Sequence, residues 1–157
     1  MFKLFSSEIK NIKYGSNLKI IEPVNIYGCK FEDDVFIGPF VEIQKNVVIG
    51  SRTKIQSHSF ICELVSIGQD CVVSHGVFFT NDKFSNGKPA KGDKSLWKST
   101  IIGNRVYIGS NSTILPVNIC NDVVIGAGSV VTKDIKKPGI YVGNPAKFLK
   151  YNPSIEN

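Results

Sequence analysis

The amino-acid sequence predicts an all-β protein, a parallel β-helix of six-residue repeats in a single domain spanning residues 1–157. An aliphatic or aromatic residue returns every six positions from Phe31 to Val73 without a slip. A smaller residue often follows each of these leading residues by four positions, and glycine often comes directly after the leader. A period of six fits neither an α-helix nor a long alternating strand, whereas short strands joined by tight corners account for it.

Each strand is expected to bury its leading residue. The leaders are Phe31, Ile37, Ile43, Ile49, Ile55, Ile61, Ile67 and Val73, and, after an interruption, Ile102, Ile108, Ile114, Ile119, Ile125 and Val131. Pro39 and Pro116 each fall two residues after a leader, at an expected corner, where a missing backbone N–H is tolerable. Stacked units of this kind pair edge to edge, each strand about 4.8 Å from the next.

The composition is that of an ordinary globular chain. Of its residues 42% are hydrophobic and 20% are charged, which excludes wholesale disorder. No run approaches about 18 apolar residues, and the N-terminal stretch lacks the long apolar segment of a signal peptide. We therefore expect no membrane span and a cytoplasmic location. The net charge of +6 suits nucleic acid, an anionic surface or a phosphorylated small molecule, but no nucleic-acid recognition pattern appears.

Neither the cysteines nor the histidines have the spacing of a metal site. Cys29, Cys62, Cys71 and Cys120 form no C-x-x-C pair, so we interpret them as small buried residues without a disulfide. The two histidines also lie apart from any cysteine pair. No metal is expected.

The repeats are interrupted between residues 79 and 101. Five lysines (Lys83, Lys88, Lys91, Lys94 and Lys98) against one aspartate, Asp93, give positions 83–98 a charge of +4. The segment also holds the single tryptophan, Trp97. A long loop in a compact domain is more often functional than not. We interpret it as a lysine-rich arm that closes over a phosphorylated ligand, the alternative being a solvated surface loop.

The repeated Ile-Gly-x-x-Val/Thr/Ser units, the stretch Gly126–Asp134 and the closing Gly143–Lys147 resemble hexapeptide-repeat acyltransferases. The resemblance implies a left-handed β-helix of triangular section with three hexads in each coil, and a homotrimer. Residues 18 apart would then stack directly, so that Ile37, Ile55 and Val73 share one interior column. Ile43 with Ile61, and Ile49 with Ile67, would begin two others. Residues 138–157 would form a C-terminal cap.

Within that family, the stretch His75–Asp82 resembles bacterial sugar-nucleotide N-acetyltransferases, as do Gly38–Gln44 and Gln56–Cys62. The resemblance implies transfer of an acetyl group from acetyl-CoA, as co-substrate, to the amine of a deoxy-amino sugar linked to UDP or dTDP. Such products serve lipopolysaccharide and other surface glycans. The resemblance leaves open which nucleotide, which sugar and which amino carbon are used.

His75 is the predicted general base, because an imidazole has its pKa near the working pH and this one stands at a corner just before the loop. It could instead be a structural corner residue, or could only orient an amine that has already lost its proton. Asn81 and Asp82, at the root of the loop, are expected within reach of the same corner. Asn81 would orient the amine or the thioester carbonyl, and Asp82 would anchor the sugar or fix the histidine tautomer. Both are also ordinary turn residues.

Further residues are predicted to bind the two substrates. The acceptor contacts are Gln44, Gln56, His58, Lys91 and Trp97. His58 precedes His75 by 17 residues and should lie nearly one coil below it on roughly the same edge. The family places CoA along the C-terminal coils between subunits, and the matching positions are Ser110, Asn111, Gly128, Ser129, Lys133 and Lys147.

Three other functions compete with N-acetylation. A sugar or serine O-acetyltransferase would share the fold, the coenzyme and possibly the base. Zinc-dependent hydration of carbon dioxide needs three histidines, and this chain has two. A non-catalytic β-helical scaffold would leave the corner histidine and its adjoining loop without a role.

Overall fold

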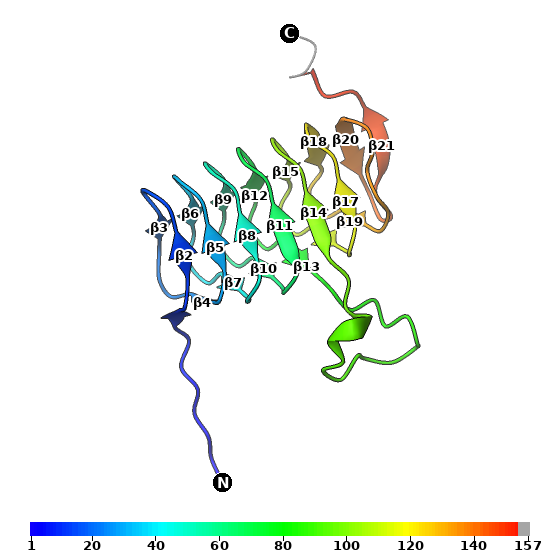
Figure 1. The fold of residues 1–157 in the computed structure, drawn as a ribbon. Helices are drawn as coiled ribbons and strands as arrows, with labels where there is room; N and C mark the ends of the chain where they lie inside the picture. The colour runs from blue at the N-terminus through cyan, green and yellow to red at the C-terminus, as the bar shows by residue number, and fades with distance from the viewer. Residues whose placement is uncertain (154–157) are drawn as a thin grey trace.

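The computed structural model describes residues 1–153 as a solenoid whose short strands enter three sheets in turn (Figure 1). Sheet A contains β1 (Ile9–Lys10), β4 (Asn25–Tyr27), β7 (Glu42–Ile43), β10 (Phe60–Ile61), β13 (Phe78–Phe79), β16 (Thr113–Ile114) and β19 (Val130–Val131). Sheet B contains β2 (Lys13–Tyr14), β5 (Lys30–Phe31), β8 (Val48–Ile49), β11 (Val65–Ile67), β14 (Thr100–Ile102) and β17 (Asn118–Ile119). Sheet C contains β3 (Lys19–Ile20), β6 (Phe36–Ile37), β9 (Lys54–Ile55), β12 (Val72–Val73), β15 (Tyr107–Ile108), β18 (Val123–Ile125), β20 (Gly139–Val142) and β21 (Lys147–Lys150).

Neighbouring coils pair in parallel, and the register follows the predicted repeat. Ile37 pairs with Ile55, and Ile55 with Val73, in sheet C. The columns of Ile43 with Ile61 in sheet A and of Ile49 with Ile67 in sheet B are also as expected. The antiparallel pair β20–β21 is the exception, and it closes the C-terminal end. The predicted all-β parallel β-helix is therefore confirmed.

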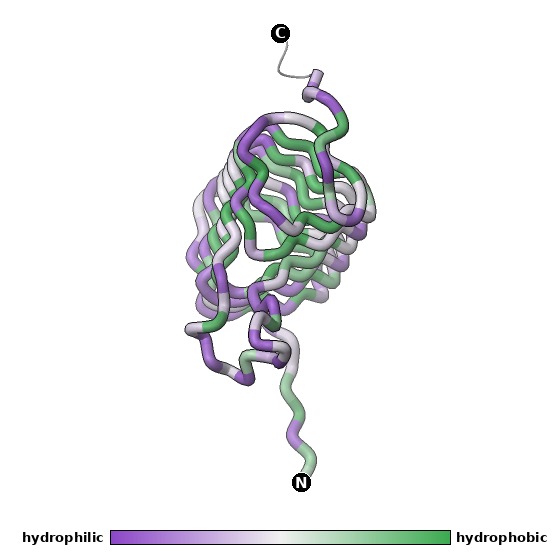
Figure 2. Tube along the Cα trace, turned by 90° about the vertical axis from the view of Figure 1, so that its right-hand side faces the viewer, coloured by the Kyte–Doolittle hydropathy of each residue, from purple (hydrophilic) through white to green (hydrophobic). Residues whose placement is uncertain are grey.

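The leading residues form the hydrophobic core. The side chains of Ile37, Ile43, Ile55 and Ile61 are fully buried inside the solenoid. Each such aliphatic side chain contributes about 1.5–3 kcal/mol when it leaves water. Figure 2 shows the coils one behind another, with hydrophobic and hydrophilic residues alternating along the chain. The outward residues are therefore the ones free to form a functional surface.

Glycine after a leader allows the coils to approach each other at the corner between sheets B and C. A Cβ on Gly50 would lie 2.5 Å from the carbonyl carbon of Gly68, and one on Gly68 would lie 2.6 Å from the carbonyl oxygen of Gly103. Real Cβ atoms do not come so close to backbone, so a larger residue would push the coils apart. The repeated glycines are thus a consequence of the coil spacing.

Two ion pairs join coils at that same corner. Arg52 binds Asp70 through two hydrogen bonds of 2.6 and 2.8 Å, and Arg105 binds Asp122 through two of 2.6 and 2.9 Å. These bonds lower the pKa of Asp70 and of Asp122 below the ordinary aspartate value. We call these four residues the charged corner. It supports the stacking and contains none of the predicted site residues.

The interruption is one loop inserted between sheets A and B. Phe79 pairs with Ile114, 35 residues on, where a normal coil steps 17 or 18. The loop spans residues 80–99, slightly less than the predicted 79–101, because Phe79 is buried in β13 and β14 already begins at Thr100. It contains one short 3-10 helix, η1 (Lys94–Leu96), and projects from the side of the solenoid (Figure 1).

The C-terminal cap expected over residues 138–157 corresponds to β20 and β21 as far as the described chain reaches. Residues 154–157 of that prediction lie outside the described residues. Among residues 1–153, no helix is long and apolar enough to span a membrane.

Candidate functional site

The corner between sheets C and A carries His75 and most of the predicted coenzyme residues. From the β6–β7 connection onward, the coils pass this corner through a residue in the left-handed conformation: Phe40, His58, Gly76, Asn111 and Gly128. Backbone hydrogen bonds stack the coils there, from Gly76 N to Ser57 O at 3.0 Å, from Asn111 N to His75 O at 2.9 Å and from Gly128 N to Ser110 O at 2.8 Å. We call Ser57, His58, His75, Ser110, Asn111 and Gly128 the histidine corner.

His75 is exposed, and a neighbouring coil holds its imidazole. Its Nδ1 lies 2.8 Å from the hydroxyl oxygen of Ser57, which is 18 residues earlier in the chain. When Nδ1 carries the proton, it donates to Ser57, and Nε2 keeps a lone pair for a substrate. Sequence reasoning did not single out Ser57. The 18-residue stacking rule could have found it.

His58 lies at the same corner, as expected from its spacing. Its ring stacks on that of Phe40, with centroids 4.8 Å apart and an interplanar angle of 29°. Both residues are exposed and both have a positive φ, 63° for His58 and 59° for Phe40. His58 is therefore supported by Phe40 in the coil below, and it remains a predicted acceptor contact.

Asn81 and Asp82 lie at a different corner from His75. His75 precedes β13 and Asn81 follows it, so the two residues are at opposite ends of one strand of sheet A. Six extended residues span up to roughly 20 Å. Within one chain the residues at the root of the loop thus stand at the next corner from His75, because one hexad is one full side of the triangular coil.

The carboxylate of Asp82 closes the inserted loop. Its two oxygens accept hydrogen bonds from the backbone N–H groups of Phe84 at 2.9 Å and Ala90 at 2.8 Å. The ring nitrogen of His75 is bound to Ser57 instead. The predicted role of Asp82 in fixing the histidine tautomer is therefore wrong within one chain, and its ordinary role as a turn residue is what the structure supports.

Asn81 secures the base of the loop. Its side-chain nitrogen donates to the carbonyl oxygen of Glu63 at 3.2 Å, and its own carbonyl accepts from Lys98 N at 2.9 Å. The predicted role in orienting an amine or a thioester would have to use the remaining amide oxygen.

Glu63 and Lys94 form an anchor for the loop that sequence reasoning missed. The Lys94 ammonium lies 2.9 and 3.1 Å from the two carboxylate oxygens of Glu63, and 5.1 Å from the centre of the Trp97 ring. The Glu63 side chain is only 10% exposed, whereas that of Lys94 is 51% exposed. The hydrogen bond with Glu63 is the main reason why the pKa of Lys94 is raised. Trp97 thus packs beside the anchor, and the Lys94 ammonium lies over its ring. Its predicted contact with the acceptor stays a prediction.

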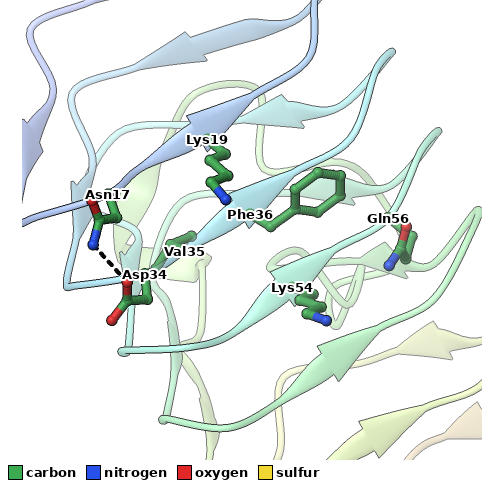
Figure 3. A pocket seen from close by; sticks show the side chains of 7 residues that line it. All are labelled: Asn17, Lys19, Asp34, Val35, Phe36, Lys54 and Gln56. Carbon is green, nitrogen blue, oxygen red and sulfur yellow. Dashed lines mark hydrogen bonds between the residues drawn. The ribbon is translucent and has the colours of Figure 1, made fainter.

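The remaining predicted acceptor residues are dispersed. Gln44 lies near the loop anchor, where its oxygen accepts from Glu63 N at 3.2 Å. Lys91 is exposed in the loop. Gln56 lines a hollow of about 410 Å³ on the face of sheet C, with Lys19 and Lys54 on either side of Phe36 (Figure 3). That hollow contains none of the other predicted site residues.

The predicted coenzyme residues divide into exposed and buried ones. Ser110, Asn111 and Gly128 lie at the histidine corner, and a Cβ on Gly128 would meet nothing within 4 Å, so the surface there is open. Ser129 is buried, and its hydroxyl oxygen accepts from Gly143 N at 3.0 Å. The Gly128 N–H already binds Ser110 O, and the Ser129 side chain is buried, so contact of these two residues with CoA stays a prediction.

The two predicted coenzyme lysines lie near the C-terminal end of the solenoid. Lys133 follows β19, and Lys147 begins β21, near the start of β19; both are exposed. Both side chains can therefore reach a ligand, and their contact with CoA stays a prediction.

No group of three histidine, cysteine, aspartate or glutamate residues able to hold a metal ion is found in residues 1–153. The cysteines are unpaired thiols. Burial raises the pKa of Cys29 to about 11 and that of Cys62 to about 12. Such thiols stay protonated near neutral pH, so neither is an effective nucleophile.

Two family models match the chain. The bacterial transferase hexapeptide model (six repeats) covers residues 28–63, and the model described as a hexapeptide repeat of succinyl-transferase covers residues 99–133. The two matched segments lie on either side of the inserted loop. They contain the histidine corner residues Ser57, His58, Ser110, Asn111 and Gly128.

Curated relatives are acetyltransferases or larger proteins. The chain is 36% identical over 127 residues to the putative lipopolysaccharide biosynthesis O-acetyl transferase WbbJ of Escherichia coli (strain K12), covering 78% of this chain and 60% of that protein. It also matches bifunctional GlmU proteins, such as that of Acinetobacter baumannii (strain AYE), at 32% identity over 126 residues and 80% of this chain. The chain spans only 25% of the length of that GlmU protein.

Solved structures show the same fold. The polySia specific acetyltransferase NeuO matches with a TM-score of 0.58 and 28% identity, over 93% of this chain and 85% of that chain. A hexapeptide-repeat containing acetyltransferase from Vibrio cholerae O1 biovar eltor, VCA0836, complexed with acetyl coenzyme A, matches with a TM-score of 0.67 and 21% identity, over 80% of this chain and 71% of that chain. The second likeness concerns the fold alone.

Proposed function

Because this chain belongs to the hexapeptide-repeat transferase family, we propose that it transfers an acetyl group from acetyl-CoA to a carbohydrate. The proposed acceptor is the amine of a deoxy-amino sugar linked to UDP or dTDP. The product would serve the synthesis of lipopolysaccharide or another surface glycan in the cytoplasm.

The observation that carries this proposal is the exposed imidazole of His75 at 2.8 Å from Ser57. With Nδ1 donating to Ser57, Nε2 is the basic nitrogen and points away from its support. A base held in one orientation, on a surface open to substrates, is what proton removal from an attacking amine requires.

The reaction balances with His75 as its only proton carrier. The amine nitrogen attacks the thioester carbonyl, a C–N bond forms, and Nε2 takes a proton from the nitrogen. The C–S bond then breaks, and the same proton passes to the departing sulfur of CoA. The products are an N-acetylated sugar and free CoA thiol, and the imidazole returns to its neutral form.

The coenzyme is proposed to lie along the coils beyond His75. Ser110, Asn111 and Gly128 continue the histidine corner in that direction, and the surface at Gly128 is open. The 36% identity to the putative O-acetyl transferase WbbJ supports an acetyl group as the one transferred. Lys133 and Lys147 are candidate contacts for the phosphates of CoA.

The site is proposed to form between copies of the chain. In one chain His75 and the loop residues Asn81 and Asp82 lie at opposite ends of β13, so a loop from a second copy would be needed to cover His75. A homotrimer would supply such a neighbour at each of three sites.

O-acetylation of a sugar hydroxyl is the second candidate. It is favoured by the names of two relatives, an O-acetyl transferase of lipopolysaccharide biosynthesis and a polySia specific acetyltransferase. The same base would serve, because a hydroxyl also has to lose a proton as it attacks.

A thiol-release assay with acetyl-CoA distinguishes these acceptors. The panel contains UDP- and dTDP-linked amino sugars, the matching sugars with hydroxyl in place of amine, and free serine. Release that requires the amine supports N-acetylation. Release with hydroxyl sugars alone supports the second candidate, and no release with any acceptor would contradict both.

A further inference from the structure

The inserted loop is an ordered structure with its own fixed points. Its ends are joined by the hydrogen bond from Lys98 N to Asn81 O at 2.9 Å. The carboxylate of Asp82 closes the first half, and the ion pair of Lys94 with the nearly buried Glu63 ties the second half to the solenoid. Its surface shape is therefore defined well enough to hold a ligand.

This loop encloses a pocket of about 230 Å³. The residues that line it are Asp82, Ser85, Asn86, Lys88, Ser95, Leu96 and Lys98. They come from both halves of the loop, so the pocket exists only when the loop is closed on itself. No residue of the coils contributes to its lining.

Most polar groups of the pocket lack partners. The side chains of Ser85, Asn86, Lys88 and Lys98 have no hydrogen bond or ion pair with any residue between 1 and 153. This distinguishes Lys88 and Lys98 from Lys94, whose ammonium is bound to Glu63. Two ammonium groups, a hydroxyl and an amide are thus available as donors at one concave surface.

The charges of the pocket favour an anion. Lys88 and Lys98 each bring a positive charge, and Asp82 is the one acidic residue of the lining. Both oxygens of Asp82 already accept backbone N–H groups, which spreads its charge into the loop. Asp93, outside the lining, binds the N–H and hydroxyl of Ser95.

We propose that the pocket in loop 80–99 binds a diphosphate group through Lys88 and Lys98, assisted by Ser85 and Asn86. Phosphate oxygens accept from several donors at once, and paired ammonium groups offset the charge of a diphosphate. Both a nucleotide-linked sugar and CoA contain this group. Assigning it to the nucleotide-linked sugar rests on the proposed function.

Isothermal titration of the full-length chain with inorganic pyrophosphate, UDP, dTDP and CoA tests the pocket. The test variant combines Lys88→Met with Lys98→Met. The matched control combines Lys3→Met with Lys83→Met, which removes the same charge from exposed positions outside the lining. We expect the test variant to weaken pyrophosphate and UDP or dTDP binding by about tenfold and the control by much less.

Equal weakening of binding in the test and control variants would overturn the proposal, because the loss of net charge alone would then explain the weakening. Unchanged binding in the test variant would also overturn it. Weaker binding of CoA with intact nucleotide binding would overturn the assignment to the sugar nucleotide. The thiol-release assay separates the two proposals. If the Lys88→Met/Lys98→Met variant releases thiol at the same rate as the unchanged protein, the proposed role of the pocket is refuted and the proposed function stands. If nucleotide binding depends on these lysines but the protein acetylates no sugar, the proposed function is refuted and the diphosphate pocket stands.

Discussion

The imidazole Nδ1 of His75 lies 2.8 Å from the hydroxyl of Ser57, although the two residues are 18 positions apart in the chain. One turn of the solenoid separates them. The same turn that stacks Ile55 beneath Val73 in the core also places Ser57 beneath His75 on the surface. The core register and the orientation of the proposed base therefore have one origin.

His75→Ala should lower kcat by roughly 10²- to 10⁴-fold, the usual contribution of a positioned general base. The fold should survive, because the side chain is exposed and not part of the core. Thiol release on the preferred acceptor measures the loss, and a thermal melt checks the fold. His58→Ala, at the same corner, serves as control and should act mainly on KM. An unchanged kcat in His75→Ala would remove the base assignment.

Ser57→Ala should lower kcat by about tenfold or less, since one neutral hydrogen bond is worth about 1 kcal/mol. The imidazole would still be present but less well oriented. Ser57→Thr keeps a hydroxyl and should recover most of the rate. If Ser57→Ala left kcat and its pH profile unchanged, the hydroxyl would have no part in positioning His75.

Lys94→Met should loosen the inserted loop, because it leaves the nearly buried Glu63 carboxylate without its cation. Limited digestion with trypsin at the remaining loop lysines measures the effect, and we expect faster cleavage than in the unchanged protein. Lys91→Met removes one exposed lysine from the same loop and is the matched control. Equal cleavage rates in the two variants would show that the ion pair does not hold the loop.

The charged corner predicts loss of stability in acid. Hydrogen bonds from Arg52 and Arg105 lower the pKa of Asp70 and Asp122 in the folded state. Their stabilising contribution is therefore complete above the unfolded value of about 3.9 and is lost as the pH falls below it towards the folded pKa. Arg52→Met with Arg105→Met should flatten the fall in Tm below about pH 4. An equally steep fall in this double variant would assign the acid sensitivity to other carboxylates.

Much of the molecule could be read from the repeat. The six-residue period predicts each strand, its buried leader and, with three hexads in a coil, the columns of Ile37, Ile55 and Val73. It also predicts that His58 and His75 lie on one edge and that a loop interrupts one coil. These features depend on local spacing, because each strand buries the same position of the repeat against the same position of the next coil.

Only the tertiary structure decided how the loop and the corners relate. Six residues make one side of a coil, so His75 and Asn81 are close in sequence and yet at different corners. The pairing of Lys94 with Glu63, 31 residues apart, and the use of Asp82 to close the loop are outside the period altogether. An insertion folds against whichever unpaired charges and N–H groups it meets, and a periodic pattern contains no information about that contact.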